Sequence, residues 1–139
     1  MKYVDIYSYD LVGYQKLFAY QSWRVAILNY IDELRVENLC YVEAHSETDE
    51  AFVLLEGSCC LIFASVEDGR IKAFECEKMD KHKVYRIPKG VFHTHTLSEN
   101  AKVLIIEEEN TSYDNSPRVY FTEHEKNVLM KTAEEGHYV

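Results

Sequence analysis

The chain has 139 residues, which suits one domain, because natural domains centre near about 100 to 150 residues. Its 15 lysines and arginines are outnumbered by 24 aspartates and glutamates, giving a formal net charge of -9. No run of basic residues could follow a phosphate backbone, and no window approaches the roughly 20 apolar residues of a membrane span. We therefore expect neither nucleic acid nor membrane as a partner, and a soluble, cytoplasmic protein.

The first 21 residues are rich in aromatic side chains at irregular spacing. These are Tyr3, Tyr7, Tyr9, Tyr14, Phe18 and Tyr20. We expect residues 1–21 to form an N-terminal arm. Two arrangements fit this composition: a flap of short strand and helix packed on the rest of the domain, or an arm that forms a dimer, since aromatic residues are enriched in interfaces.

Eight segments with the composition of β-strands follow the arm. They are rich in β-branched residues or alternate between apolar and polar residues, and they span 22–31, 38–45, 51–57, 58–66, 70–79, 83–88, 91–97 and 101–109. Between two of them, Asp68-Gly69 favours a tight hairpin, because both residues tolerate a positive φ. Short strands separated by frequent turn signals predict an all-β barrel or sandwich over residues 22–110.

The end of the last predicted strand and the C-terminal extension have a more polar character. The glutamates at 107–109 are interpreted as the solvated end of that strand. Further along, Thr122 and Glu125 have the spacing of a helix capping box, and Val128 and Leu129 follow. We therefore predict a short helix within a C-terminal extension over residues 111–139.

Two of the predicted strands each carry ligand-type side chains on one face. Residues two apart on a strand project to the same side, so Tyr41, Glu43 and His45 share one face, and His93 and His95 share another. Divalent Fe, Mn, Zn and Ni accept imidazole nitrogen and carboxylate oxygen, and a barrel interior can bring such groups to one ion at about 2.0 to 2.3 Å. A site for a divalent transition metal is therefore one interpretation of this pattern.

The spacing of these residues resembles that of the cupin superfamily. The first cupin motif has two histidines one residue apart, then a glutamate, six residues and a glycine. Here Glu43-Ala44-His45, four residues, Glu50, six residues and Gly57 fill that frame. The second motif, Pro-x-Gly, two residues and a histidine, is matched by residues 88–93. The resemblance covers roughly residues 38–109 and implies a double-stranded β-helix, or jelly-roll, barrel.

The resemblance implies a metal held by His45, Glu50 and His93. The sequence departs from the motif at Glu43, where a histidine is usual, and at Leu97, where an asparagine is common. Glu43 either ligates the metal or orients an imidazole from outside the ligand set. His95 is the other candidate for a fourth ligand. Two histidines packed and hydrogen-bonded without metal remain an alternative, since some cupins work without one.

The leading functional hypothesis is a small metal-dependent enzyme. The metal would act as a Lewis acid on a small polar substrate, such as an oxo-acid, a diketone or a sugar-like compound. Of Glu43 and His95, whichever is not a ligand would transfer protons, and Tyr41 is a further candidate acid. Isomerase, dioxygenase and decarboxylase chemistry all fit these groups.

Two other functions fit the same resemblance. One is a metal-free sugar isomerase or epimerase that uses a histidine and tyrosine as an acid-base pair. Its nucleotide-linked substrates need basic residues, for which Arg86, expected beside the cavity, and Arg24 are the candidates. The other is a non-catalytic module that binds a small ligand. Because cupins commonly pair through edge strands or N-terminal arms, we also expect a homodimer.

Overall fold

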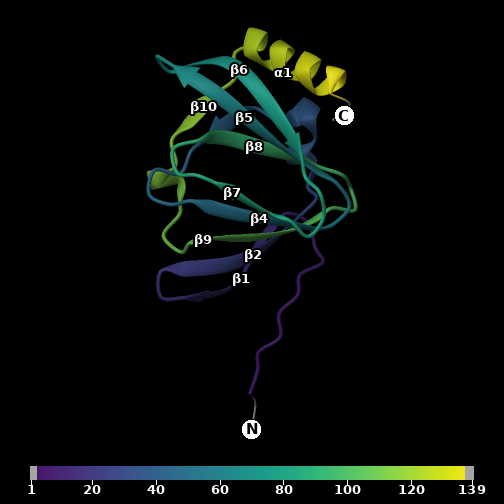
Figure 1. The fold of residues 1–139 in the computed structure, drawn as a ribbon, viewed down its shortest axis with the longest axis vertical. Helices are drawn as coiled ribbons and strands as arrows, with labels where there is room; N and C mark the ends of the chain where they lie inside the picture. The colour runs from purple at the N-terminus through teal and green to yellow at the C-terminus, as the bar shows by residue number, and fades with distance from the viewer. Residues whose placement is uncertain (1–2, 137–139) are drawn as a thin grey trace.

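The barrel consists of two antiparallel five-stranded sheets that curl around a common interior (Figure 1). In this computed structural model, which describes residues 3–136, the first sheet has the order β1-β2-β9-β4-β7 and the second the order β10-β3-β8-β5-β6. The non-consecutive neighbours make this a jelly roll rather than a meander. The predicted all-β jelly-roll fold is confirmed.

The strands of the first sheet are β1 (Tyr14–Tyr20), β2 (Trp23–Asn29), β9 (Lys102–Glu108), β4 (Glu50–Glu56) and β7 (Val84–Ile87). Those of the second are β10 (Arg118–Tyr120), β3 (Tyr41–Glu43), β8 (Phe92–Leu97), β5 (Cys59–Glu67) and β6 (Arg70–Lys78). Three short 3-10 helices and one α-helix complete the fold: η1 (Asp32–Leu34), η2 (Val36–Asn38), η3 (Tyr113–Asn115) and α1 (Glu123–Glu135). The eight predicted strands are confirmed, and the short strand β10 was not predicted.

The N-terminal segment is partly as expected. Residues 14–20 form β1, which pairs antiparallel with β2 at the edge of the first sheet. The expected helix is wrong, since residues 3–13 carry no helix or strand and extend away from the barrel (Figure 1). The side-chain amide of Asn29 anchors this tail by donating to the carbonyls of Tyr9 and Leu11, at 3.0 and 2.7 Å. Tyr3 and Ile6 of this tail are exposed. The homodimer expected from the aromatic arm stays a prediction.

The barrel interior is apolar except at one end. Phe52 and Leu54 of β4 pack with Leu61 of β5 and with Val103 of β9 in one buried cluster. Side chains alternate along a strand, so Glu50 shares the inward face of Phe52 and Leu54. A carboxylate on this apolar face is costly unless it is paired, and its surroundings therefore mark the candidate site.

Helix α1 packs on the outer face of the second sheet. Leu129 and Ala133 of α1 pack in one buried cluster with Ile62 and Phe74. The predicted capping box is present, with Thr122 Oγ1 accepting from the Glu125 amide and Glu125 Oε1 accepting from the Thr122 amide, at 3.1 and 2.8 Å. The predicted helix is confirmed. No helix within residues 3–136 has the length and apolarity needed to cross a bilayer.

The motif glycine Gly57 occupies a turn that no other residue fits. Its φ is +71°, and a Cβ atom there would lie 2.7 Å from the backbone of Ala101. We expect Gly57→Ala to lower the free energy of unfolding by about 2 kcal/mol or more, combining strain and a backbone clash. Urea unfolding measures this. Gly69→Ala is the matched control, because Gly69 has a φ of +74° but open space around it. Equal losses in the two variants would contradict the role of the close approach.

Candidate metal centre

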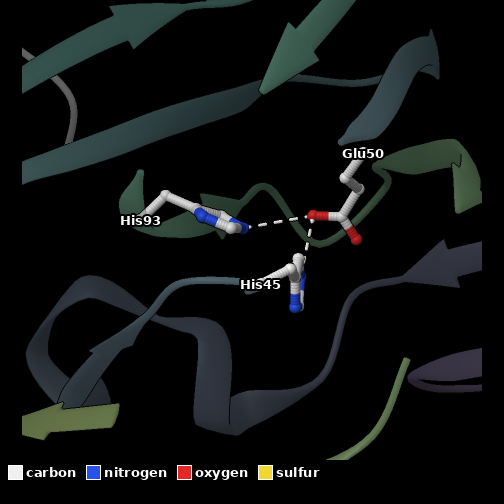
Figure 2. A group of neighbouring side chains, drawn as sticks. All are labelled: His45, Glu50 and His93. Carbon is white, nitrogen blue, oxygen red and sulfur yellow. Dashed lines mark hydrogen bonds and ion pairs between the residues drawn. The ribbon is translucent and has the colours of Figure 1, made fainter. Parts of the chain in front are cut away.

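Three buried side chains meet at one end of the barrel interior. Glu50 Oε1 lies 3.1 Å from His93 Nε2 and 3.4 Å from His45 Nε2 (Figure 2). One potential ligand atom from each of the three residues lies within 4.8 Å of the other two. The trio implied by the sequence motifs is therefore brought together, and within residues 3–136 it is the one group of three ligand-type residues at this spacing.

Hydrogen bonds between the two sequence motifs hold the trio in place. The Gly90 amide donates to the His45 carbonyl at 2.8 Å, and Asp49 Oδ1 accepts from the Lys89 amide at the same distance. Gly90 has a φ of +84°, which a glycine adopts without steric cost. The turn before β8 is thereby fastened to the loop between β3 and β4. This brings His45 and Glu50 to His93 although 43 residues separate Glu50 from His93.

Both imidazoles direct Nε2 toward Glu50 because Nδ1 of each ring is occupied. His93 Nδ1 lies 2.9 Å from the Val91 carbonyl, which can only accept, so Nδ1 carries the proton. His45 Nδ1 lies 2.8 Å from Ser116 Oγ. In a neutral His93 ring, Nε2 would then present a lone pair to a carboxylate oxygen at 3.1 Å. Such a contact requires a cation, which is either a second proton on the ring or a metal ion between the two atoms.

The charges of the trio suit a divalent cation. Burial by itself would raise the pKa of Glu50, but hydrogen bonds from His45 and His93 outweigh it and hold the pKa well below its ordinary value. Burial would lower the pKa of His45, but the hydrogen bond and charge of Glu50 outweigh it and raise the pKa. Glu50 is therefore ionised at neutral pH, as a carboxylate ligand must be.

A cavity of about 320 Å³ adjoins the trio. Besides the three residues, its polar lining includes Tyr14, Arg24, Tyr41, Glu43, Glu107 and Arg118. A larger cavity of about 450 Å³ is lined by Arg35, Cys59 and Thr96. None of the trio lines that larger cavity, so the smaller cavity is the candidate substrate site.

Glu107 is a cavity residue that the sequence interpretation missed. It was expected at the solvated end of a strand, but its side chain is buried and accepts from Tyr14 Oη at 3.0 Å. It also pairs with Arg24 Nη2 at 3.3 Å. Burial, and then the charge of Glu50, raises the pKa of Glu107 to about 7. Alternation along β9 could have identified Glu107 in the sequence, because it continues the inward face of Val103 and Ile105.

Glu43 lines the cavity, but its carboxylate is paired with an arginine. Glu43 Oε2 accepts from Arg118 Nε at 3.1 Å, and Glu43 is not among the three clustered ligands. The Arg118 guanidinium lies over the Tyr41 ring at 4.2 Å and over the Tyr113 ring at 4.6 Å. Arg118 and Tyr113 were not predicted, because both belong to the C-terminal extension and reach β3 through tertiary structure. Burial, and then the charge of Glu43, raises the pKa of Tyr41.

His95 and Arg86 have different positions relative to the cavity. His95 lines it, with its ring edge-on to Phe52 at 5.4 Å and its Nδ1 buried without a hydrogen-bond partner. Burial, and then the charge of His93, lowers the pKa of His95 to about 4. The expectation that Arg86 lies beside the cavity is wrong. Its side chain is 74% exposed on the edge strand β7 and does not line the cavity.

Ser116 is a buried residue that orients a candidate ligand. Because its hydroxyl contacts His45 Nδ1, we expect Ser116→Ala to lower the affinity for a divalent metal by about 10- to 100-fold, the usual effect of losing such a partner. Competition with a chromogenic chelator measures this. Ser46→Ala is the matched control, since Ser46 Oγ donates to the carbonyl of Asn115 in the same loop. Equal effects of both variants would show that the loop matters and the imidazole contact does not.

Comparisons with known proteins support the fold. The chain matches no protein-family model and no curated protein sequence. Among solved structures it is similar to a cupin-2 domain protein from Shewanella frigidimarina, at 20% identity and a TM-score of 0.52, over 73% of this chain and 85% of that one. It is also similar to a histidine-to-glutamine variant of Streptomyces PAC13 with uridine, at 9% identity and a TM-score of 0.55, over 84% and 88% of the two chains.

A third likeness is to a variant of Bacillus subtilis oxalate decarboxylase. Its identity is 13% and its TM-score 0.51, and the match covers 70% of this chain but 24% of that larger one. At such identities the likenesses concern the fold and leave the reaction open. Together with the jelly-roll topology and the buried His45, Glu50 and His93, they show that this chain has the cupin fold.

Proposed function

We propose that the protein is a divalent-metal-binding cupin enzyme that acts on a small polar substrate. The observation that supports it is the convergence of His45, Glu50 and His93 in the barrel interior, where one potential ligand atom of each residue lies within 4.8 Å of the other two. His45, Glu50 and His93 would hold the ion. Two imidazoles and one carboxylate suit Fe, Mn, Zn or Ni.

The metal, when bound, would supply Lewis acidity toward a carbonyl, carboxylate or enolate oxygen of the substrate. The chain's own groups bind and orient the rest of the molecule. Tyr41 and His95 line the cavity, where they can exchange hydrogen bonds or protons with a substrate. Glu43 is proposed to hold Arg118 against the Tyr41 ring rather than to ligate the metal.

The test is metal analysis followed by a turnover screen. The purified protein is reconstituted separately with Fe, Mn, Zn and Ni, and the bound metal is measured beside His45→Ala and His93→Ala. We expect stoichiometric metal in the native protein and its loss in both variants. The loaded protein is then screened with 2-oxo acids, diketones, keto-sugars and uridine, the last because PAC13 carries it. A native protein that retains no metal would refute the proposal.

A metal-free sugar isomerase or epimerase is the second candidate. It is favoured by His95 and Tyr41, an imidazole and a phenol that line the same cavity. Turnover that survives removal of metal by a chelator and persists in His93→Ala would select it. Thermal shifts with ligands but without turnover would select a non-catalytic binding protein.

A further inference from the structure

Unpartnered polar atoms gather around the cavity. Five buried side-chain atoms within residues 3–136 lack a hydrogen-bond partner, and three of them belong to cavity-lining residues: Arg24 Nε, His95 Nδ1 and Thr111 Oγ1. Buried polar atoms are nearly always hydrogen-bonded in folded proteins. A concentration of exceptions at one cavity indicates groups that a ligand satisfies.

The charged groups of the same cavity, by contrast, already have partners. Arg24 pairs with Glu107 at 3.3 Å and donates from Nη1 to the carbonyl of Glu109 at 3.0 Å. These Arg24 and Glu107 side chains are 16% and 4% exposed, so this pair is well removed from water. Glu107 and the Glu109 carbonyl thus occupy the two Nη atoms of the guanidinium, and the Nε–H of Arg24 is the donor left without a partner.

Arg118, a second arginine of the cavity lining, is also paired. Glu43 accepts from its Nε, and the rings of Tyr41 and Tyr113 lie on the guanidinium. No lysine lines the cavity. Apart from the metal trio, each carboxylate of the lining therefore faces one arginine. An anionic group entering this space would lose its hydration without meeting an unpaired cation, which is costly.

From the unpartnered polar atoms and the paired charges of the lining we propose that the cavity binds a small compound with several hydroxyl or carbonyl groups. The part of this compound that lies outside the metal site is uncharged. Hydrogen bonds to Arg24 Nε, His95 Nδ1 and Thr111 Oγ1 would recognise it. The inference rests on the proposed function in taking this cavity as the substrate site. It narrows the substrate class by disfavouring dicarboxylates, uronates and nucleotide-linked sugars.

Two matched pairs of probes test the charge preference by titration calorimetry. D-glucose is compared with D-glucuronate, and 2-oxoglutaramate with 2-oxoglutarate, so that each pair differs by one distal carboxylate. In each pair the member without the distal carboxylate is termed the neutral probe, although 2-oxoglutaramate keeps its C1 carboxylate. We expect this member to bind about tenfold more tightly. Stronger or equal binding of the charged members, or no binding by either pair, would overturn the proposal.

The titrations are run on metal-free and metal-loaded protein, with metal content measured on the same samples. Preference for the neutral probes in a protein that takes up no metal would leave this inference standing and refute the proposed metal enzyme. A protein that takes up metal but prefers the charged probes would refute this inference and leave the proposed metal enzyme standing. The two failures are therefore distinguishable.

The Glu43→Gln variant tests the pairing directly. It removes the charge that balances Arg118, and we expect the preference for the neutral probes to fall to about one while metal content is unchanged. Glu56→Gln is the control, because Glu56 is exposed and faces Lys102 across β4 and β9. Loss of metal in Glu43→Gln would make Glu43 a ligand and overturn its role as the partner of Arg118.

Thr111→Val tests the unpartnered hydroxyl. Valine has nearly the shape of threonine, and Thr111 Oγ1 has no partner to lose, so the free energy of unfolding should not decrease. Loss of one ligand hydrogen bond should weaken binding of the neutral probes about fivefold. Unchanged affinity would remove Thr111 from the recognition set and overturn that part of the proposal.

Discussion

Replacing His93 by alanine is expected to lower the affinity for divalent metal by more than about 100-fold, since loss of even an outer partner of a ligand costs 10- to 100-fold. His93 lies at the centre of the site: its Nε2 contacts Glu50, and its Nδ1 is fixed by the Val91 carbonyl. Without this ring, His45 and Glu50 would remain as a two-ligand site, which binds metal weakly in water. Chelator competition at constant pH measures the change.

His124→Ala is the control for the His93 variant. His124 is exposed on helix α1, so its loss removes an imidazole from the chain without touching the cavity. Circular dichroism checks that both variants are folded. A His93 variant that kept the native affinity, with His124→Ala also unchanged, would place the metal elsewhere.

Metal affinity is expected to fall steeply as the pH is lowered. The pKa of His45 is raised above its ordinary value of 6.5 by the hydrogen bond and charge of Glu50, which outweigh burial. Below that raised pKa, a metal must displace a proton from the ring, and the apparent affinity should drop about tenfold per pH unit for one proton. The lowered pKa of Glu50 keeps the carboxylate ionised over the same range.

Calorimetric metal titrations between pH 8 and pH 5, in buffers of different ionisation enthalpy, would check this dependence. Proton release should accompany binding at the lower pH values and disappear at the higher ones. His45→Ala is the internal comparison, because it should bind metal weakly and with a smaller pH dependence. A native affinity that did not change with pH would mean that the bound ion does not compete for His45.

The motif residues could be placed from the sequence because strand alternation and turn glycines are local features. Alternation placed His93 and His95 on one face, the cupin motif placed Glu50, and Gly57 and Gly90 have the positive φ values that turns require. The eight strands followed from the same local patterns. Glu107 was missed because three glutamates in a row hide the alternation of β9, in which the first of them faces inward.

The partners of the cavity residues could not be predicted, because pairing between segments far apart in the sequence brings them together. Arg118 reaches Glu43 across 75 residues of sequence, and Ser116 reaches His45 across 71. Strand β10, which positions Arg118, has three residues, too few for a periodic signal. Because the pairing with Arg118 could not be seen in the sequence, Glu43 was a candidate ligand from its place in the motif. In the structure its carboxylate is paired with Arg118.

The most direct test is anomalous X-ray diffraction from crystals of the protein reconstituted with Mn, Fe, Ni or Zn. We predict an anomalous peak between the side chains shown in Figure 2, with the ion about 2.0 to 2.3 Å from His45 Nε2, His93 Nε2 and a Glu50 oxygen. Absence of a peak there under conditions in which the protein is saturated, or a peak only at another position, would contradict a metal site built from these three residues.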